Sequence, residues 1–491
     1  MFETAELGVS VDKEAYKREV PKLREGLLTA QKELAVSNLA VVVVIGGVEG
    51  AGKAETVNQL LEWVDARGVE THAMGAPTDE ERERPPMWRF WRLLPSRGRM
   101  GIFLGSWYTD PIVQRVFGEM GDAPFGQALD RLVEFERMLI REGVVVVKFW
   151  LHLKQDALVK RMKALEKDPL QSWRVTPQDW KFVKRYKRFR RISEKAMLRT
   201  GIGEAPWHIV EATDGRYRNL TVGKTLLRVL EERLAAWKAR PKSQNVPDRP
   251  KPPKANIIRN LDLSLALDEK RYEKELLTCM AELNLLTRRL YEKRRSVTLV
   301  FEGPDAAGKG GAIRRLTAAM DARNYQHIAV AAPTDEERAH PYLWRFWRNL
   351  PRLGRVTIYD RSWYGRVLVE RIEGFCSRED WQRAYAEINA FEEALTDFGV
   401  ILIKFWLAIS PQEQLRRFKE RQGTPYKQYK ITEEDWRNRA KWDGYEAAAV
   451  ELIEKTSTAR TPWVLAEATD KNYARIKVMK AVVRHLKKEL G

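Results

Sequence analysis

The sequence is poor in the residues that build metal centres and covalent cross-links. It has two cysteines, Cys279 and Cys376, and six histidines scattered through 491 residues. Two cysteines make no disulfide framework or zinc cluster, and the scattered histidines argue against a histidine-based metal site. No apolar run approaches the length of a membrane-spanning helix, and the charged N-terminus has no signal-peptide pattern. We therefore expect a cytoplasmic protein without a membrane partner.

Acidic residues are in the minority. Lysine and arginine number 87 against 68 aspartates and glutamates, which gives a net charge of +19. A chain this basic suits a polyanionic partner such as nucleic acid, anionic lipid or polyphosphate, but charge alone does not choose among them or exclude an ordinary solvated surface. The apolar fraction of 44% supports sizeable cores.

The chain is a tandem duplication. Lys53 and Lys309 are 256 residues apart, and the same offset relates PTDEERERPPMWRFWRLLP to PTDEERAHPYLWRFWRNLP. A period this long is a whole domain rather than a solenoid repeat. We expect a first repeat at 1–239, a second at 257–491, and a proline- and lysine-rich connector at 240–256.

Each repeat alternates apolar, strand-like runs with helical segments. This order predicts an α/β fold with a mostly parallel sheet flanked by helices on both faces. The second repeat follows the plan of the first and includes a helix expected over 336–350. In the first repeat we expect helices near 11–36, 55–66, 80–94, 130–142 and 222–237, and strands near 41–45, 70–74, 99–104, 144–150 and 207–210.

A glycine-rich loop organises the second repeat. The apolar run at 297–301 leads into GPDAAGKGG and then into a segment compatible with a helix. The spacing fits G-x-x-x-x-G-K, ending in Gly308 and Lys309, a pattern that holds phosphate with backbone N–H groups, a helix N-terminus and a lysine. Gly310 stands where serine or threonine normally holds Mg²⁺, so Asp305 inside the loop is the candidate ligand.

A second motif, VTIYDRSWYGR, ends a buried strand at Asp360 and Arg361. Open α/β sheets bind ligands at this carboxyl edge, where an aspartate can hold Mg²⁺ and an arginine can fork onto phosphate oxygens. The first repeat has Leu104 and Gly105 at these two places. We therefore expect the second repeat to be catalytic and the first to be structural or accessory. The alternative is that the first repeat uses a different ligand set.

A basic segment follows the fourth strand of the second repeat. Arg417 and Arg421 lie on a predicted helix, and Lys427 and Lys430 lie in the loop after it. These side chains could close over a phosphate-rich substrate as a lid, although each alone is equally well explained as a solvated surface residue. The first repeat keeps fewer cations here, which favours a functional role in the second.

The segment PTDEERAHPYLWRFWRNLP carries further candidates. Trp344 and Trp347 are one helical turn apart, and we expect them to be core anchors rather than base-stacking residues. We expect Asp335 and Glu336 to cap the helix rather than to bind metal or nucleotide.

GPDAAGKGG, YDRSWYGR, IKFWLAIS and TPYKQYK together resemble the polyphosphate kinase 2 family, and the match covers essentially each repeat. The tandem arrangement resembles the two-domain subgroup of that family, the polyphosphate:AMP phosphotransferases. The resemblance implies tandem P-loop kinase-like domains with a helical lid, and it accounts for Gly310, because the family's loop has glycine there. It also implies that Asp305 and Asp360 position Mg²⁺, while Lys309, Arg361 and the lid hold polyphosphate and the acceptor phosphate.

The motifs and the resemblance together give a set of predicted site residues. The catalytic residues are Asp305, Lys309, Asp360 and Arg361, and the metal ligands are Asp305 and Asp360. The phosphate-binding residues are Gly303, Ala306, Ala307, Gly308, Gly310, Gly311, Arg366, Arg417, Arg421, Lys427 and Lys430.

The implied reaction moves the terminal phosphoryl group of inorganic polyphosphate to AMP and gives ADP. Alternatives are a polyphosphate-dependent nucleoside diphosphate kinase, an ATP-dependent nucleotide kinase, and a non-enzymatic binding protein. The paired Asp305 and Asp360 argue against the last, and the two-domain arrangement is the only argument for a monophosphate acceptor. We expect AMP and polyphosphate rather than nucleic acid as partners. The duplication predicts an intrachain pseudo-dimer and is compatible with a further homo-oligomer.

Overall fold

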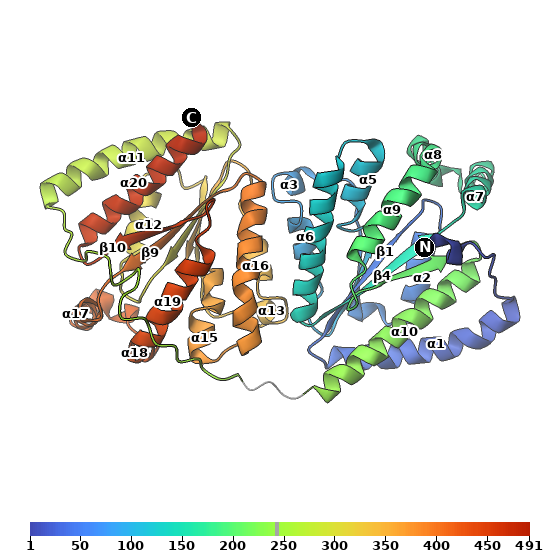
Figure 1. Ribbon diagram of the computed structural model, residues 1–491, viewed down its shortest axis with the longest axis horizontal. Helices are drawn as coiled ribbons and strands as arrows, with labels where there is room; N and C mark the ends of the chain where they lie inside the picture. The colour runs from blue at the N-terminus through green and yellow to red at the C-terminus, as the bar shows by residue number, and fades with distance from the viewer. Residues whose placement is uncertain (241–244) are drawn as a thin grey trace. The chain divides into compact units, whose positions relative to one another are not determined.

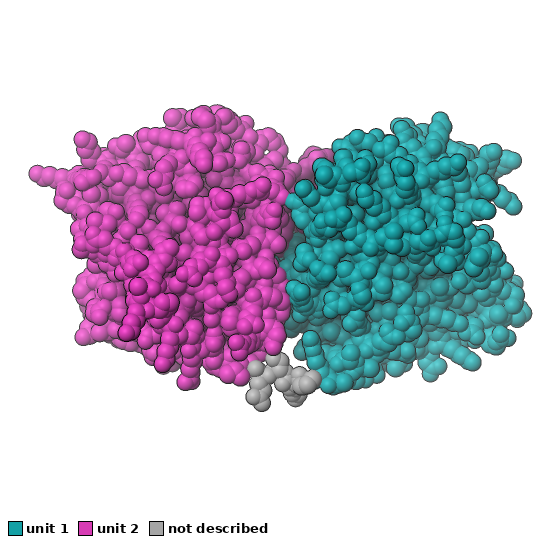
Figure 2. Space-filling view, viewed as in Figure 1, with its two compact units in different colours: residues 1–77, 89–241, 333–345 teal, residues 78–88, 242–332, 346–491 magenta. Residues whose placement is uncertain are grey.

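The computed structural model describes residues 1–240 and 245–491, apart from the side chain of Lys430. Part of the predicted connector and the Lys430 side chain therefore lie outside the described residues. The chain divides into two compact units (Figure 2). Unit 1 contains Met1–Pro77, Arg89–Pro241 and Pro333–Arg345, and unit 2 contains Thr78–Trp88, Lys242–Ala332 and Phe346–Gly491.

Each unit includes a short segment from the other repeat. In unit 2, Glu83 of the first repeat pairs with Arg294 and Arg352 of the second. In unit 1, the backbone N–H of Arg97 donates to the carbonyl oxygen of Ala339, 2.8 Å away. Sequence repeat and compact unit are therefore not identical around the two PTDEE segments.

Unit 1 is built on one parallel sheet. Its strand order is β2-β3-β1-β4-β5, with β1 in the centre, and every neighbouring pair is parallel. The valine-rich β1 and β4 are buried nearly throughout, as expected for strands covered on both faces. The strands are β1 (Ala40–Gly47), β2 (Val69–Ala73), β3 (Met100–Leu104), β4 (Val144–His152) and β5 (Trp207–Glu211).

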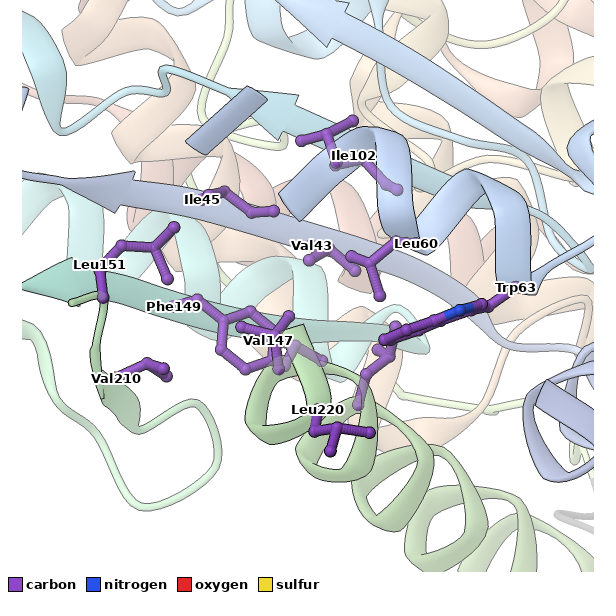
Figure 3. Packing of buried hydrophobic residues seen from close by; sticks show 14 of the residues in the cluster. Val43, Ile45, Leu60, Trp63, Ile102, Val147, Phe149, Leu151, Val210 and Leu220 are labelled. Atoms are coloured by element: carbon purple, nitrogen blue, oxygen red, sulfur yellow. The ribbon is translucent and has the colours of Figure 1, made fainter. Parts of the chain in front are cut away.

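Helices cover both faces of this sheet (Figure 1). On one face, Leu60, Trp63 and Leu220 of α2 and α10 pack on Val43 and Phe149 (Figure 3). Helices α6 and α9 contact β4 from the other face. The helices are α1 (Lys13–Ala35), α2 (Lys53–Trp63), α5 (Thr109–Phe117), α6 (Asp122–Arg141), α7 (Gln155–Lys167), α8 (Pro177–Lys184), α9 (Tyr186–Thr200) and α10 (Gly215–Ala239), with short turns η1 (Phe2–Ala5), η2 (Ala66–Gly68) and η3 (Ser172–Arg174).

Unit 2 repeats this plan with the parallel order β7-β8-β6-β9-β10. Its strands are β6 (Val297–Glu302), β7 (Tyr325–Ala329), β8 (Val356–Asp360), β9 (Ile401–Ala408) and β10 (Trp463–Glu467). Its helical elements are α11 (Glu269–Glu292), α12 (Lys309–Ala318), η4 (Trp363–Arg366), α15 (Val369–Glu373), α16 (Arg378–Asp397), α17 (Pro411–Gln422), η5 (Pro425–Lys430), α18 (Glu433–Ala440), α19 (Trp442–Thr456) and α20 (Lys471–Leu490). The predicted α/β fold with duplicated parallel sheets is thus confirmed. No helix among the described residues is long and apolar enough to cross a membrane.

Two predicted helices, over 80–94 and 336–350, are wrong. Each is split into two short helices, because Pro85, Pro86 and Pro341 lack the N–H that a helix needs and disfavour helical geometry in the residue before them. The short helices are α3 (Asp79–Arg82) and α4 (Trp88–Arg92) in the first repeat, and α13 (Asp335–Arg338) and α14 (Trp344–Trp347) in the second.

The predicted cap of the second of these segments is also corrected. Thr334, not Asp335 or Glu336, caps α13, and it exchanges side-chain and backbone hydrogen bonds with Glu337 in a capping box. Asp335 and Glu336 lie in the first turn, where negative charge favours the helix N-terminus. Trp344 is buried, as expected of a core anchor.

An equivalent buried ion pair joins a strand to a helix in each unit, to α6 in unit 1 and to α16 in unit 2. In unit 2, Lys404 of β9 donates to Glu392 of α16 at 2.7 Å and to the carbonyl oxygen of Thr456 at 2.7 Å. Glu392 also accepts from the indole N–H of Trp363 at 3.0 Å and from the hydroxyl of Tyr364. These bonds fix the part of the strand-end motif that follows β8. Their counterparts in unit 1 join Lys148, Glu136, Trp107, Tyr108 and Thr200.

Candidate active site

The predicted phosphate loop connects β6 to α12 through left-handed turns. Gly303, Ala306 and Gly308 have φ angles of +138°, +63° and +105°. A Cβ atom on Gly303 would lie 2.4 Å from the carbonyl oxygen of Leu407, so only glycine fits there. Helix α12 begins at Lys309 with no side-chain cap. Its first N–H groups and its dipole therefore face the loop as a site for an anion.

Lys309 lies folded over this loop. Its Nζ donates to the carbonyl oxygens of Gly303 at 2.7 Å and Pro304 at 3.2 Å, and the side chain is largely buried. The structure thus brings the predicted Gly303, Ala306, Ala307, Gly308, Lys309, Gly310 and Gly311 into one strand–loop–helix turn.

Asp305 and Arg361 meet across the carboxyl edge of the sheet. Arg361 Nη2 donates to Asp305 Oδ1 at 2.6 Å, and Asn438 of α18 donates to Asp305 Oδ2 at 3.0 Å. Burial opposes ionisation of Asp305, but the charges of Arg361 and Lys309 outweigh it and lower the pKa of the carboxyl below its ordinary value. Asp305 is therefore an anion held between two cations.

Asp360 ends β8 beside the first turn of α12. A Cβ atom on Gly310 would lie 4.0 Å from Asp360 Oδ2, so the missing side chain at Gly310 leaves space in front of this carboxylate. Among the described residues no hydrogen bond or ion pair reaches the Asp360 side chain, whereas both oxygens of Asp305 already accept hydrogen bonds.

This donor set fits Mg²⁺. The described residues contain no group of three or more potential metal ligands. Mg²⁺, however, commonly uses only one or two carboxylates and completes its shell with water and substrate phosphates. Asp360 and Asp305 supply two carboxylates at the edge where the phosphate loop lies.

The cations predicted to bind phosphate outside the loop are held in different ways. Arg417 is buried on α17 and donates to Glu413 and to the carbonyl oxygens of Ala306 and Ala468, so it braces the loop. Lys427 lies 2.8 Å from Glu420, and Arg366 lies 2.8 Å from Glu370, outside the lid. Arg421 lies on α17 and is partly exposed.

Sequence reasoning missed several polar residues at this edge. Glu302, the last residue of β6, accepts a hydrogen bond from Ser362 at 2.8 Å, and burial raises the pKa of its carboxyl to about 7. Asn438 holds Asp305, and Arg475 of α20 lies near Gly311, where a Cβ would be 3.7 Å from its Nη2.

A repeat comparison could have revealed these residues. The first repeat has Gly46 in place of Glu302, Phe182 in place of Asn438 and Asn219 in place of Arg475. The charges of Glu302 and Arg475 and the amide of Asn438 are absent where the strand-end motif is absent. Alignment of the two repeats offers this signal.

A cavity of about 440 Å³ opens beside the loop in unit 2. This volume is within the range of small-molecule sites. Glu302, Asp305 and Arg361 contribute polar and charged groups to its lining. Its apolar lining includes Ile258, Leu263, Leu368, Val369, Trp406, Ile409 and Trp442.

The first repeat fills its phosphate site with its own carboxylates. Glu55, which stands at the place of Gly311, accepts a hydrogen bond from Arg174 and another from Arg161 at 3.4 Å. Burial opposes ionisation of Glu55, but the hydrogen bond from Arg174 lowers the pKa of its carboxyl below the ordinary value. Lys53 is paired with Glu49 at 2.9 Å. These three cations are thus paired with carboxylates of the same unit.

Unit 2 therefore has a glycine-rich phosphate loop at the carboxyl edge of a parallel sheet, with one carboxylate in the loop and a second carboxylate and an arginine at the end of the neighbouring strand. This combination defines the class of P-loop phosphoryl-transfer proteins. The chain belongs to the polyphosphate kinase 2 family, as the motifs indicated. The sequence model of that family matches residues 10–238 and 266–490, one match in each repeat.

Similar proteins support this assignment over the full chain. A polyphosphate:AMP phosphotransferase of Pseudomonas aeruginosa is 52% identical over 98% of both chains, and one of Acinetobacter johnsonii is 37% identical over 91% of both. A crystal structure of a protein from Pseudomonas aeruginosa, described as a polyphosphate kinase 2, superposes with a TM-score of 0.89 at 49% identity and covers 100% of this chain and 99% of its own.

Proposed function

We propose that this protein transfers the terminal phosphoryl group of inorganic polyphosphate to AMP and releases ADP. The relatives that match it over nearly their whole length carry the name of this activity. The observation that carries the proposal is the arrangement in unit 2, where Asp305, Arg361 and Lys309 surround the start of α12 beside a cavity of about 440 Å³.

The phosphate loop suits the polyanionic donor. The N–H groups at the start of α12 and the Lys309 ammonium would hold the terminal phosphates of polyphosphate, and Arg475 would add charge next to Gly311. Arg417 acts indirectly, because it donates to the carbonyl oxygen of Ala306 and so holds the loop in place. A highly basic chain also favours the encounter with such a donor.

The acceptor phosphate would lie at the strand-end motif. Arg361 is positioned to hold AMP so that a phosphate oxygen attacks the terminal phosphorus of polyphosphate in line with the bond that breaks. A new P–O bond forms on AMP, the bridging P–O bond of polyphosphate breaks, and the shortened chain leaves with the electron pair. No covalent enzyme intermediate is needed.

Asp360 and Asp305 are the residues that would hold Mg²⁺. When bound, the ion supplies positive charge that offsets the charge on the transferred phosphoryl group and on its donor. Asp360 has no competing partner among the described residues, whereas Asp305 must share its oxygens with Arg361 and Asn438. We infer that Asp360 is the more direct ligand of the two.

The cavity of unit 2 suits the nucleoside of the acceptor. Its apolar lining includes the indoles of Trp406 and Trp442, and it reaches Asp305 and Arg361 at the phosphate site. A base held among aromatic and aliphatic side chains would leave the 5′-phosphate facing the loop. We assign catalysis to the second repeat, 257–491, and an accessory role to the first, 1–239.

The test is ADP formation from AMP, long-chain polyphosphate and Mg²⁺ without ATP. We expect ADP to appear only when all three are present, and a chelator of divalent ions to stop it. ADP formation with ATP but not with polyphosphate would refute the donor assignment. If ATP forms from ADP faster than ADP forms from AMP, a diphosphate acceptor is favoured instead. ADP is the substrate in the name of a shorter relative, an ADP-polyphosphate phosphotransferase that is 37% identical over 210 residues.

A further inference from the structure

The chain forms a similar arm in front of each repeat. The 256-residue offset extends into this region, because Asp12 and Asp268 are the N-caps of α1 and α11. The arms are also tied to their own units in the same way. The N–H of Val11 donates to Asp214 at 3.5 Å in unit 1, and the N–H of Leu267 donates to Asp470 at 3.2 Å in unit 2.

An ion pair with reversed polarity holds both arms. In unit 1, Glu3 of the arm pairs with Arg190 of α9 at 2.6 Å. At the equivalent two positions in unit 2, Arg259 of the arm pairs with Glu446 of α19. Both charges have been exchanged while the contact has been kept. The two arms therefore dock at equivalent places on their respective units.

The docked arm closes this place completely in unit 1. Phe2 lies in the turn η1, which packs against β5, and its side chain is 0% exposed. Its ring stacks on His152 at the end of β4, with 4.4 Å between ring centroids and 6° between planes, and lies 6.1 Å from the ring of Trp150. Glu6 of the arm places its Oε1 atom 2.9 Å from the ring nitrogen Nε2 of His152.

The equivalent place in unit 2 is open. Ile258 stands where unit 1 has Phe2, and Ala408 stands where it has His152, so two rings are replaced by smaller side chains. Trp406 is retained at the position of Trp150. Ile258, Trp406 and Ala408 all line the cavity of about 440 Å³. An aromatic ring thus occupies in unit 1 the place that is a pocket in unit 2.

We propose that the arm determines whether each repeat accepts a nucleoside. Ile258 forms the wall that sets the size of the acceptor pocket in the second repeat. In the first repeat, the ring of Phe2 occupies the equivalent pocket, in the place that a nucleotide base would take. The inference rests on the proposed function, since it assigns a specificity-determining residue for the same acceptor. It also explains why a duplicated domain would bind one nucleotide rather than two.

The Ile258→Phe variant tests this wall by placing in the second repeat the phenylalanine that the first repeat has at the equivalent position. The added ring would enter the pocket, so the KM for AMP should rise about tenfold or more while the KM for polyphosphate stays the same. Binding of AMP measured by calorimetry should weaken by the same factor. Ile257→Phe is the matched control, because Ile257 is the adjacent arm residue, is 43% exposed and does not line the cavity. It should leave both constants unchanged.

Ile258→Ala tests the same wall in the opposite direction. A smaller side chain would enlarge the pocket, so the ratio of kcat/KM for N6-benzyl-AMP to kcat/KM for AMP should rise about tenfold. A variant that merely loosened the arm would lower both values together and would leave this ratio where it was. An unchanged ratio in Ile258→Ala, or an unchanged AMP affinity in folded Ile258→Phe, would overturn the proposal.

The outcome is distinguishable from failure of the proposed function. If the wild-type protein forms no ADP from polyphosphate, the donor assignment fails. Calorimetric binding of AMP to the wild type and to Ile258→Phe would still decide the role of the arm. Circular dichroism and the melting temperature of each variant establish that the second repeat is folded when the constants are measured.

Discussion

Glu392→Gln should destabilise unit 2 more than any surface change, because it leaves a buried lysine without its counter-charge. Lys404 is fully buried, and its ammonium is held by Glu392 at 2.7 Å, the hydroxyl of Tyr364 at 3.1 Å and the carbonyl oxygen of Thr456 at 2.7 Å. Glutamine keeps the shape of the side chain and removes the charge. Breaking a buried pair in this way costs about 3–5 kcal/mol. For a unit of this size, that loss lowers the melting temperature by roughly 6–20 °C.

The pH dependence of this loss has a definite sign. Burial already lowers the pKa of Lys404, and without the carboxylate its pKa should fall further. The folded state would then bind fewer protons than the unfolded state, so stability would rise as pH increases through the folded pKa. The deficit of Glu392→Gln relative to the wild type should therefore be smaller at pH 9 than at pH 7.

Calorimetric unfolding of the full chain is the assay, with Glu136→Gln as the matched control. Glu136 has the equivalent bonds to Lys148 in unit 1, so this variant should be destabilised in the other unit. Short polyphosphate identifies the transition of unit 2, since a ligand raises the transition of the unit that binds it. Only Glu392→Gln should also lower turnover, because Glu392 holds Trp363 of the strand-end motif. A loss below about 1 kcal/mol, as for an exposed pair, would refute the reasoning.

Two further predictions separate the repeats. Asp360→Asn should lower turnover by about 100-fold or more, which is the scale expected for loss of one preorganised electrostatic group. Lys53→Ala should leave most of the turnover. Equal losses in the two variants would contradict the assignment of catalysis to the second repeat. Glu55→Gly should free Arg174 and raise the number of tripolyphosphate molecules bound per chain from one to two by calorimetry, and the reciprocal Gly311→Glu should abolish binding in the second repeat. Unchanged stoichiometry in Glu55→Gly would show that the carboxylate does not block the first site.

Most of the fold was predictable because it depends on local periodicity and on the exact repeat. The valine-rich runs at β1 and β4 have the composition of strands buried on both faces, and the 256-residue offset transfers each element to the second repeat. The predictions from sequence fail where contacts between distant segments determine the structure. The split at Pro341 was readable from the proline itself, but the inclusion of Glu83 in unit 2 depends on ion pairs with Arg294 and Arg352 that no local pattern indicates.

The site was predictable where a motif carries the chemistry. The glycine loop and the strand-end Asp360 have fixed positions along the chain, so the parallel sheet brings them to one edge. Asn438 is 133 residues from the Asp305 that it holds, and Arg417 braces the loop from 111 residues away, so their contacts depend on how α17 and α18 fold back. The sequence does not show whether a cation on a lid helix faces a substrate or a backbone carbonyl oxygen.

Backbone strain gives an independent reason to place the chemistry in the second repeat. Ala306 and Arg361 both adopt φ angles of +63°, a left-handed conformation that costs a residue with a side chain about 1–2 kcal/mol. At the equivalent positions the first repeat has Gly50 and Gly105, with φ angles of +72° and +78°, where glycine adopts the same turn without that cost. The backbone is therefore retained in both repeats, but only the second keeps an arginine at the strained strand end. That arginine holds the Asp305 carboxylate at 2.6 Å, so in the second repeat the strained residue has a partner at the phosphate loop. In the first repeat, where Lys53 of the loop is paired with Glu49, glycine relieves the strain.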